Sequence, residues 1–249
     1  MEYLFSNSGK KFLKTLSRND FLFAFDYDGT LAPYFPDPVG DRIPKNIFLN
    51  LSRLEKVRKL AVISGRAVND LRGLLYPLKP RYIVGNHGSE GLKIKGFSKE
   101  KSIRECKRWI RRISASEVQG VVIENKVFTL SLHYKNAVSP VKAKKHILKV
   151  VERLVPPPRI VFGKKVINLL PQEAPNKGDS VLALLNKSRL KGVIYFGDDL
   201  TDEDVFCLKN RGVFGVRVGK NHKSRASYYI KNQREINRVI TEILKASCI

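Results

Sequence analysis

The sequence predicts an α/β fold: a doubly wound, Rossmann-like parallel sheet carrying an inserted α+β domain. Short apolar runs alternate with helical patterns, and each run ends in glycine and polar residues. Between two such halves lies a segment, 92–175, whose expected strands follow one another closely in the sequence. We therefore expect a core formed by residues 1–91 and 176–249, with residues 92–175 as a separate domain. The 249 residues suffice for one large domain or two modest ones.

The first expected strand of the core is the apolar run FLFAF at residues 21–25. A run that is apolar at every position is typical of a strand buried on both faces of a parallel sheet. Before it, residues 1–20 interleave apolar side chains with lysines, which predicts a short amphipathic helix. Asp26 and Asp28 follow the run, so two carboxylates are expected at the carboxyl end of a buried strand.

Further apolar runs of strand length lie on both sides of the insert. The runs at 59–63 and 82–84 end in the polar segments SGR and GNHGSE, and helical spacing at 68–75 separates them. After the insert, the run at 192–196 ends in GDDLTDED, and a last short run covers 212–216. Ligands of doubly wound sheets bind outside the carboxyl ends of the strands, so several of these polar segments are expected to meet at one crevice.

The insert combines helices with a different kind of strand. Its expected elements are a helix at 98–114, strands at 121–124 and 128–134, a helix at 140–154, and strands at 159–162 and 165–170. The strand at 128–134 alternates apolar and polar residues, and three prolines at 156–158 end the second helix. A segment of this kind between two halves of a parallel sheet indicates a lid domain.

The DYDGT segment has the residues needed to cleave a phosphate ester. A carboxylate at a strand end, here Asp26, can attack phosphorus and form an aspartyl-phosphate, which divides one difficult step into two. Asp28 lies two residues further on, on the same side of an extended chain, where it can protonate the leaving oxygen and later deprotonate water. Gly29 allows the sharp turn that follows.

A dianionic phosphate approaches two carboxylates only if positive charge intervenes. Mg²⁺ prefers oxygen ligands, and Asp198 and Asp199 after a buried strand are the expected further ligands beside the first acid pair. Ser64 can donate its hydroxyl and backbone N–H to phosphoryl oxygens, and Lys177 can neutralise the charge that develops in the transition state.

Each of these segments also has a simpler structural explanation. DYDGT alone is compatible with an Asp-Gly turn, SGR with a helix N-cap, and Lys177 with a solvated surface lysine. GDDLTDED is compatible with an acidic helix start or a calcium loop, although it lacks the remainder of an EF-hand. The combination of all four along one chain is what favours a phosphatase.

Composition and charge limit the other classes of function. No apolar run approaches the roughly 20 residues of a membrane-spanning helix, and the first residues lack a signal-peptide pattern. Cys106, Cys207 and Cys248 are far apart and odd in number, so we expect no disulfide framework and a cytoplasmic location. The sequence leaves the oligomeric state open.

The formal charge of +24 arises from 47 Lys and Arg against 23 Asp and Glu. A positive field concentrates polyanions and also speeds the capture of small phosphate esters, so charge alone does not separate these functions. The basic residues are scattered and lack aromatic neighbours that would stack bases, so a dedicated nucleic-acid function is not expected.

The segments together resemble the motifs of the haloacid-dehalogenase-like (HAD) hydrolases, and more narrowly those of trehalose-6-phosphate phosphatases. The residues that carry the resemblance are DYDGT at 26–30, SGR at 64–66, GNHGSE at 85–90, ENK at 124–126, SLHYK at 131–135, NKG at 176–178 and GDDLTDE at 197–203. The resemblance implies that Asp26 is nucleophile and Mg²⁺ ligand, that Asp28 is acid/base and a ligand through its carbonyl, and that Asp198 completes the ligands. The residues it implies for phosphate binding are Ser64, Gly65, Arg66 and Lys177.

The resemblance also implies that residues 92–175 are a cap that closes over the sugar. The residues it implies for substrate binding are Asn86, His87, Glu90, Glu124, Lys126 and His133. Two departures bear on sugar recognition: NLLP at 168–171 stands where the family usually has a Glu-x-Arg-Pro-like stretch, and Lys135 replaces a common Arg.

The resulting hypothesis is a Mg²⁺-dependent phosphatase that hydrolyses trehalose 6-phosphate through an aspartyl-phosphate. Another sugar phosphate, such as that of sucrose, glucosylglycerol or mannosylglycerate, or a broad range of them, is the alternative within the same fold. A basic protein that binds nucleic acid or another polyanion is the alternative of a different class.

Overall fold

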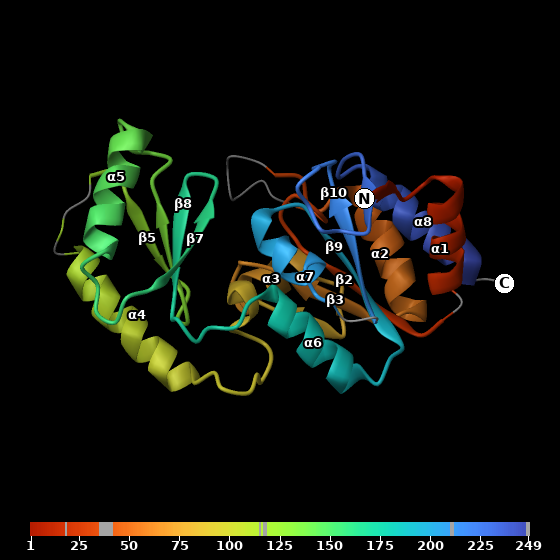
Figure 1. Ribbon diagram of the computed structural model, residues 1–249, viewed down its shortest axis with the longest axis horizontal. Helices are drawn as coiled ribbons and strands as arrows, with labels where there is room; N and C mark the ends of the chain where they lie inside the picture. Colours follow the sequence, from red (N-terminus) through yellow and green to blue (C-terminus); the bar gives the residue numbers. More distant parts are fainter. Residues whose placement is uncertain (18, 35–41, 115, 117–118, 210–211, 248–249) are drawn as a thin grey trace. The chain divides into compact units, whose positions relative to one another are not determined.

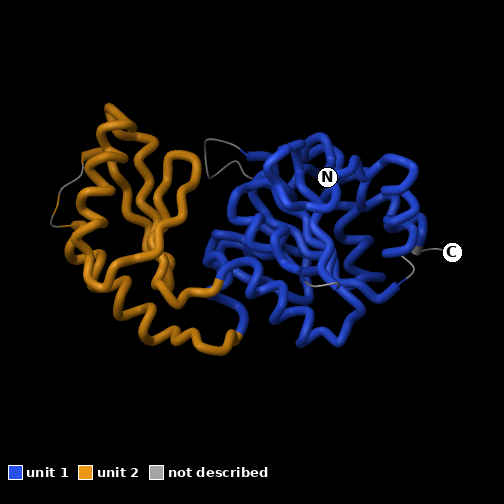
Figure 2. The backbone as a smooth tube through the Cα atoms, in the orientation of Figure 1, with its two compact units in different colours: residues 1–92, 176–249 blue, residues 93–175 orange. Residues whose placement is uncertain are grey.

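The computed structural model describes residues 1–17, 19–34, 42–114, 116, 119–209 and 212–247, which form two compact units (Figure 1). Unit 1 comprises Met1–Leu92 and Asn176–Ile249, and unit 2 comprises Lys93–Pro175 (Figure 2). Cys248 lies outside the described residues.

Unit 1 is built on a seven-stranded parallel sheet with the order β1-β11-β10-β9-β2-β3-β4 in the described part of the chain. Its strands are β1 (Glu2–Tyr3), β2 (Phe21–Phe25), β3 (Leu60–Ile63), β4 (Tyr82–Val84), β9 (Gly192–Gly197), β10 (Val213–Val218) and β11 (Tyr228–Ile230). From β2 the chain proceeds outward to β3 and β4, and later from β9 outward to β10 and β11. The order of the strands therefore reverses between β2 and β9, which is where sheets of this kind bind ligands.

Helices cover both faces of this sheet. They are α1 (Asn7–Ser17), α2 (Lys45–Val57), α3 (Val68–Leu75), α6 (Lys177–Ser188), α7 (Glu203–Phe206) and α8 (Glu235–Ser247), with short 3-10 helices η2 (Asn86–Gly88) and η3 (Leu200–Asp202). Figure 1 shows α1, α2 and α8 on one side of the sheet and α6 on the other. Apolar stripes of α1, α2 and α8 pack with Phe23, Phe25 and Phe196 in one core, whose burial from water stabilises the sheet.

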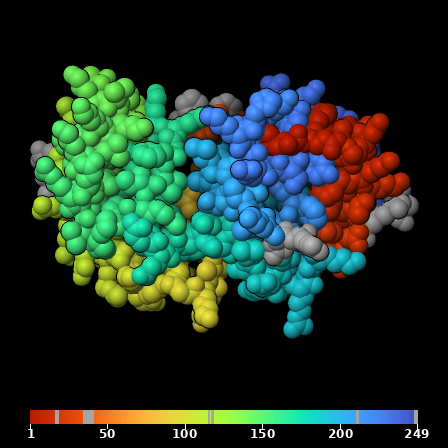
Figure 3. Space-filling model, viewed as in Figure 1, coloured from red at the N-terminus to blue at the C-terminus, as the bar shows by residue number. Residues whose placement is uncertain are grey.

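In its described residues, unit 2 is a four-stranded antiparallel sheet with two helices on one face. The sheet order is β5-β6-β8-β7, from β5 (Val122–Asn125), β6 (Leu130–His133), β7 (Arg159–Gly163) and β8 (Val166–Leu170). Leu130, Leu132 and Ile167 pack with apolar residues of α4 (Lys99–Ser114) and α5 (Pro140–Val151) in a second core. Figure 3 shows residues of α5, in green, at the surface of unit 2.

The α/β fold class is confirmed, including the parallel sheet and the second, antiparallel one. The predicted and observed elements differ in short segments and at the ends of elements. The helix expected at 140–154 ends at Val151, because the chain turns before the proline segment, and the strand expected at 128–134 is limited to Leu130–His133. Strands β1 and β11 were not predicted, because runs of two or three residues show no period and neither is followed by a glycine-led polar segment such as the one after 82–84.

Candidate active site

The end of β2 places Asp26 at the point where the strand order reverses. The Asp26 backbone N–H donates to the Phe196 carbonyl at 2.8 Å, which continues the pairing of β2 with β9 by one residue. The Asp26 side chain is buried, with the residue 5% exposed. The chain then turns at Gly29, whose φ of +81° lies in the left-handed region that favours glycine.

Space is a second reason for glycine at this position. A Cβ atom on Gly29 would overlap the carboxylate of Asp198. The acids after β2 and β9 therefore approach each other across a backbone that has no side chain between them.

The end of β9 is organised by Asp202, which lies in η3 and is completely buried. Its Oδ2 accepts the backbone N–H groups of Asp198 and Asp199, both at 2.8 Å. Its Oδ1 accepts the Lys177 ammonium at 2.7 Å and the Tyr195 hydroxyl at 2.6 Å. Four donors use the capacity of a carboxylate, so Asp202 holds the other groups in place and has little left for a ligand of its own.

Lys177 is the first residue of α6, and an N-terminal capping box positions it. The Asn176 side chain accepts the Asp179 N–H at 2.9 Å, and the Asp179 carboxylate accepts the Asn176 N–H at 2.9 Å. The Lys177 ammonium lies 3.1 Å from Asp26 Oδ1 in addition to its bond with Asp202. Burial alone would lower the pKa of Lys177, but the Asp202 and Asp26 carboxylates outweigh it and raise the pKa, so the lysine is charged.

Three carboxylates form a cluster of the kind that binds a metal ion. Oxygens of Asp26, Asp198 and Asp202 lie within 4.8 Å of one another. Burial raises the pKa of Asp26 well above its ordinary value, and the negative charges of Asp202 and Asp198 raise it further. Burial and the Asp202 charge likewise raise the pKa of Asp198 to about 7. One lysine does not balance three carboxylates, so this cluster favours a cation.

The donors suit a hard divalent cation, which prefers oxygen ligands. Because Asp202 already accepts four hydrogen bonds, Asp26 and Asp198 are the better ligands of the three. Thr30 donates its hydroxyl to Asp198 Oδ1 at 3.2 Å and so orients that carboxylate.

The sequence predicted Asp199 as a metal ligand, but its side chain lies outside the cluster of three carboxylates. Its exposed side chain caps η3 by accepting the Leu200 N–H at 2.7 Å, and in the described residues the metal cluster contains Asp202 in its place. The reason is the turn after β9: adjacent side chains point in different directions, and η3 brings Asp202 back beneath the loop. Arg217 supports the same loop from β10 by donating to the carbonyls of Asp198 and Asp199. Neither Asp202 nor Arg217 was predicted as a site residue. The GDxxxD spacing from Gly197 to Asp202 is a sequence signal that could have indicated Asp202, whereas an isolated Arg in a strand gives no such signal.

The SGR turn follows β3, as predicted. Ser64 is buried, and its hydroxyl accepts the Arg66 N–H at 3.2 Å. Arg66 forms a two-point pair with Asp28, with Nε to Oδ2 at 2.8 Å and Nη2 to Oδ1 at 2.5 Å, and its guanidinium lies over the Tyr27 ring. The turn therefore contacts the second acid of DYDGT directly. Gly65 lies against the His87 ring, which a Cβ on Gly65 would overlap.

The GNHGSE segment is bonded to this turn. The backbone N–H groups of Asn86 and His87 donate to the carbonyls of Arg66 and Ser64, at 2.8 and 3.0 Å. Glu90 Oε2 accepts the side chain of Asn86 and the backbone N–H of Val68, both at 2.8 Å. Asn86 is buried, so Asn86 and Glu90 have structural bonds in this framework, while His87 is half-buried beside Gly65.

The three expected substrate residues of unit 2 form one cluster. Glu124 Oε2 lies 2.7 Å from His133 Nε2 and 3.5 Å from the Lys126 ammonium. Burial alone would raise the pKa of Glu124, but the hydrogen bond with His133 and the charge of Lys126 lower it. Asn168 is the first residue of NLLP, the stretch that differs from the family pattern. Its Oδ1 accepts the Ser131 hydroxyl at 2.6 Å, and its Nδ2 donates to the Val161 carbonyl at 3.2 Å within the sheet.

In the described part of the chain, no helix is long and apolar enough to span a membrane.

Comparison with known proteins supports the family resemblance that the motifs indicate. The family model for trehalose-phosphatase matches residues 24–235. Trehalose-6-phosphate phosphatase of Escherichia coli (strain K12) is 30% identical over 205 residues, which cover 78% of this chain and 76% of that protein. Trehalose-phosphate phosphatase B of Arabidopsis thaliana is 26% identical over 249 residues, and 65% of its length is covered against 88% of this chain.

Solved structures show the same fold. The C-terminal domain of C. albicans trehalose-6-phosphate phosphatase superposes with a TM-score of 0.75 at 22% identity, over 95% of this chain and 97% of that one. The family match covers most of the sequence and confirms the resemblance of the motifs, so this chain belongs to the trehalose-phosphatase family of HAD-like phosphatases.

Proposed function

We propose that this chain hydrolyses trehalose 6-phosphate to trehalose and phosphate as a Mg²⁺-dependent enzyme. The observation that carries the proposal is the buried cluster at the ends of β2 and β9, where the Lys177 ammonium contacts both Asp26 and Asp202 and the Asp198 carboxylate lies close by. In a member of the trehalose-phosphatase family, this cluster supplies a nucleophile, positive charge and oxygen ligands at one point.

Asp26 is the nucleophile in this proposal. One carboxylate oxygen attacks phosphorus, the bond from phosphorus to the sugar oxygen breaks, and its electron pair leaves with that oxygen. The product on the enzyme is an aspartyl-phosphate. In the second step a water oxygen attacks the same phosphorus, and cleavage of the phosphorus–oxygen bond to Asp26 releases phosphate and restores the carboxylate.

Asp28 moves the protons. It donates one to the leaving sugar oxygen in the first step and accepts one from the attacking water in the second. Its side chain is 28% exposed, so it can reach a substrate, and Arg66 orients it through the two-point pair.

Three further assignments complete the phosphate site. Ser64, Gly65 and Arg66 bind phosphoryl oxygens through hydroxyl, backbone N–H and guanidinium donors, and Lys177 neutralises charge in the transition state. Asp26 and Asp198 would hold Mg²⁺ through their carboxylates, and Asp28 through its backbone carbonyl. When bound, the ion supplies the charge that lets a dianionic phosphate approach the carboxylates and polarises the phosphoryl group.

We assign recognition of the sugar to unit 2, as a cap domain. Glu124, Lys126 and His133 offer hydrogen-bond donors and acceptors on one side of its sheet. A sugar-phosphate substrate and three widely spaced cysteines are consistent with a cytoplasmic enzyme.

The test is phosphate release from a panel of sugar phosphates with and without Mg²⁺. The panel contains trehalose 6-phosphate, glucose 6-phosphate, and the phosphates of sucrose, glucosylglycerol and mannosylglycerate. We expect fastest turnover of trehalose 6-phosphate, and no turnover by Asp26→Asn, whose fold should stay intact by circular dichroism. Turnover of trehalose 6-phosphate no faster than that of glucose 6-phosphate would refute the substrate, and retained turnover by Asp26→Asn would refute the mechanism.

A further inference from the structure

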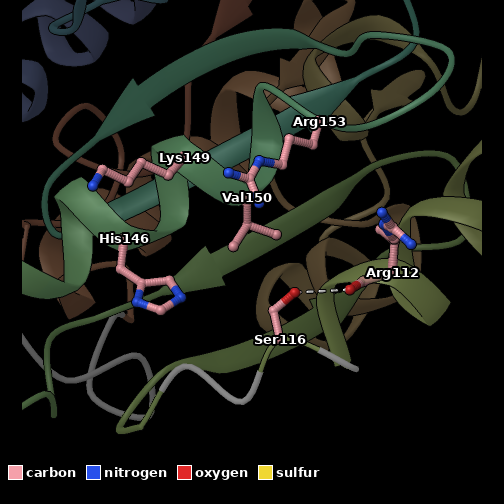
Figure 4. Close-up of a pocket in the computed structure, with 6 residues that line it drawn as sticks. All are labelled: Arg112, Ser116, His146, Lys149, Val150 and Arg153. Atoms are coloured by element: carbon pink, nitrogen blue, oxygen red, sulfur yellow. Dashed lines mark hydrogen bonds between the residues drawn. The ribbon is translucent and has the colours of Figure 1, made fainter.

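Unit 2 contains a pocket that takes no part in the chemistry above. It has a volume of about 420 Å³ and is lined by Arg112, Ser116, His146, Lys149, Val150 and Arg153 (Figure 4). The residues come from the end of α4 and from α5 and the turn that follows it. Positions 146, 149 and 150 lie on one face of α5, and Arg153 follows in the turn after the helix, so these residues line the pocket as a stripe.

The lining of this pocket is strongly basic. Two arginines, a lysine and a histidine contribute to it, and none of the six described lining residues carries a carboxylate. In the part of the chain that the structure describes, no ion pair involves Arg112, His146, Lys149 or Arg153. Like charges gathered around a hollow repel one another, so the arrangement does nothing for the stability of unit 2 and suits an anion.

The helices extend the positive charge beyond the pocket. α4 carries seven Lys or Arg against two Glu, and α5 carries four Lys and no acid. Their core-facing residues, such as Trp109 and Ile147, pack on the side of the sheet formed by Leu130 and Leu132. The expected sugar-binding cluster around His133 lies on the opposite side, because successive residues of β6 alternate between the faces of the sheet.

We propose that this pocket is a second anion site, which binds a small ligand carrying two or more linked phosphates. Its volume lies in the range of small-molecule sites, roughly 300–1,000 Å³. The guanidinium groups of Arg112 and Arg153 can each bind a phosphate through two parallel hydrogen bonds. The Lys149 ammonium adds a point charge to the same lining. A single phosphate would leave most of this charge unbalanced, whereas a linked di- or triphosphate matches several cations at once.

Inorganic triphosphate is the probe for this site, and Trp109 is the reporter. The chain has one Trp, which precedes Arg112 by one helical turn, and its Nε1–H donates to the Pro156 carbonyl at 2.7 Å, three residues after Arg153. Emission of Trp109 is therefore a readout local to the pocket side of unit 2. The titration uses the full chain without Mg²⁺ and with a chelator, so that metal-assisted binding at the Asp26 cluster does not contribute.

A matched pair of double variants separates the pocket from the general charge of the helices. Arg112→Glu/Lys149→Glu reverses two charges of the lining. Lys107→Glu/Lys144→Glu reverses two charges on the same helices, but each position is five residues from its counterpart, about 140° around the helix. All four residues are exposed, so both variants should stay folded, although Lys144→Glu also removes the contact of the Lys144 ammonium with the Phe162 ring.

We expect saturable binding of triphosphate that weakens with added salt. The pocket variant should lose affinity by about tenfold or more, while the control stays within about threefold. Equal losses of triphosphate affinity in both variants, or no saturable binding at low salt, would refute the proposed anion site. A DNA duplex of about 20 base pairs that binds more tightly than triphosphate, and is weakened equally by both variants, would instead make the helices a nucleic-acid surface.

Discussion

Lys177 Nζ lies 3.1 Å from Asp26 Oδ1, and both side chains are buried, although one residue follows the second strand and the other begins the sixth helix. The same ammonium group bonds Asp202 at 2.7 Å. One cation is thus shared by the proposed nucleophile and by the acid that organises the opposite loop. Loss of this lysine would leave two carboxylates in a buried site without their partner.

Lys177→Ala should therefore reduce both activity and stability. Removing one partner of a buried ion pair costs about 3–5 kcal/mol, so the free energy of unfolding should fall by an amount of that order. Loss of transition-state charge neutralisation should lower kcat by roughly 10²–10³. Denaturant unfolding and phosphate release measure the two effects. Lys187→Ala, at an exposed position of the same helix, is the control, and equal behaviour of the two variants would contradict the shared role.

Asp202 and Asp199 should differ sharply when each is changed to Asn. In Asp202→Asn an amide group would face the ammonium of Lys177 and the hydroxyl of Tyr195, so the cluster loses an acceptor. Loss of such a supporting group typically lowers metal affinity or activity by about 10–100-fold. Asp199→Asn keeps a good N-cap and should remain within about twofold of the parent. Activity titrated with Mg²⁺ checks both, and a greater loss in Asp199→Asn would reverse the assignment.

Gly29→Ala should disrupt the site through backbone and side chain together. A non-glycine residue at this positive φ costs about 1–2 kcal/mol, and the added Cβ would displace the Asp198 carboxylate. We expect weaker Mg²⁺ activation and a lower unfolding midpoint. The matched control is Gly73→Ala in α3, where a Cβ meets no atom within 4 Å. That variant should gain about 0.5–1 kcal/mol from helix propensity with unchanged activity, and a similar loss in both would refute the argument.

The acid cluster predicts that stabilisation by Mg²⁺ grows with pH. Asp198 has its pKa raised from an ordinary 3.8 to about 7. The folded state therefore binds the Asp198 proton more tightly than the unfolded state does. The stability that this proton contributes is fully present below the ordinary pKa and is lost as pH rises through about 7. Mg²⁺ binds the ionised form and replaces the proton.

The measurement is the thermal unfolding midpoint with and without Mg²⁺, at about pH 5.5 and at about pH 8. We expect the larger upward shift at the higher pH. Asp198→Asn should remove most of the difference between the two pH values. A shift that is equal at both, or larger in acid, would show that this carboxylate does not control binding of the ion.

Much of the fold and part of the candidate site could be predicted from local patterns. The strand at 21–25 is apolar at every position, and a strand buried on both faces needs a covered parallel sheet. Because parallel strands align their carboxyl ends, the acids after β2 and β9 had to approach each other once the two strands were neighbours. Lys177 was harder, since only the capping box of α6 and the burial of its side chain distinguish it from a surface lysine.

The sequence by itself determined the fold class, the family, and the strand ends at which acids, a serine and an arginine occur, because burial patterns and motif spacing are local properties. Tertiary structure decided which of those groups meet. It placed Asp202 rather than Asp199 in the cluster, paired Arg66 with Asp28, and used Glu90 to cap α3. The direction of a side chain at a turn depends on the dihedral angles of that turn and on what packs beneath it, which spacing along the chain does not specify.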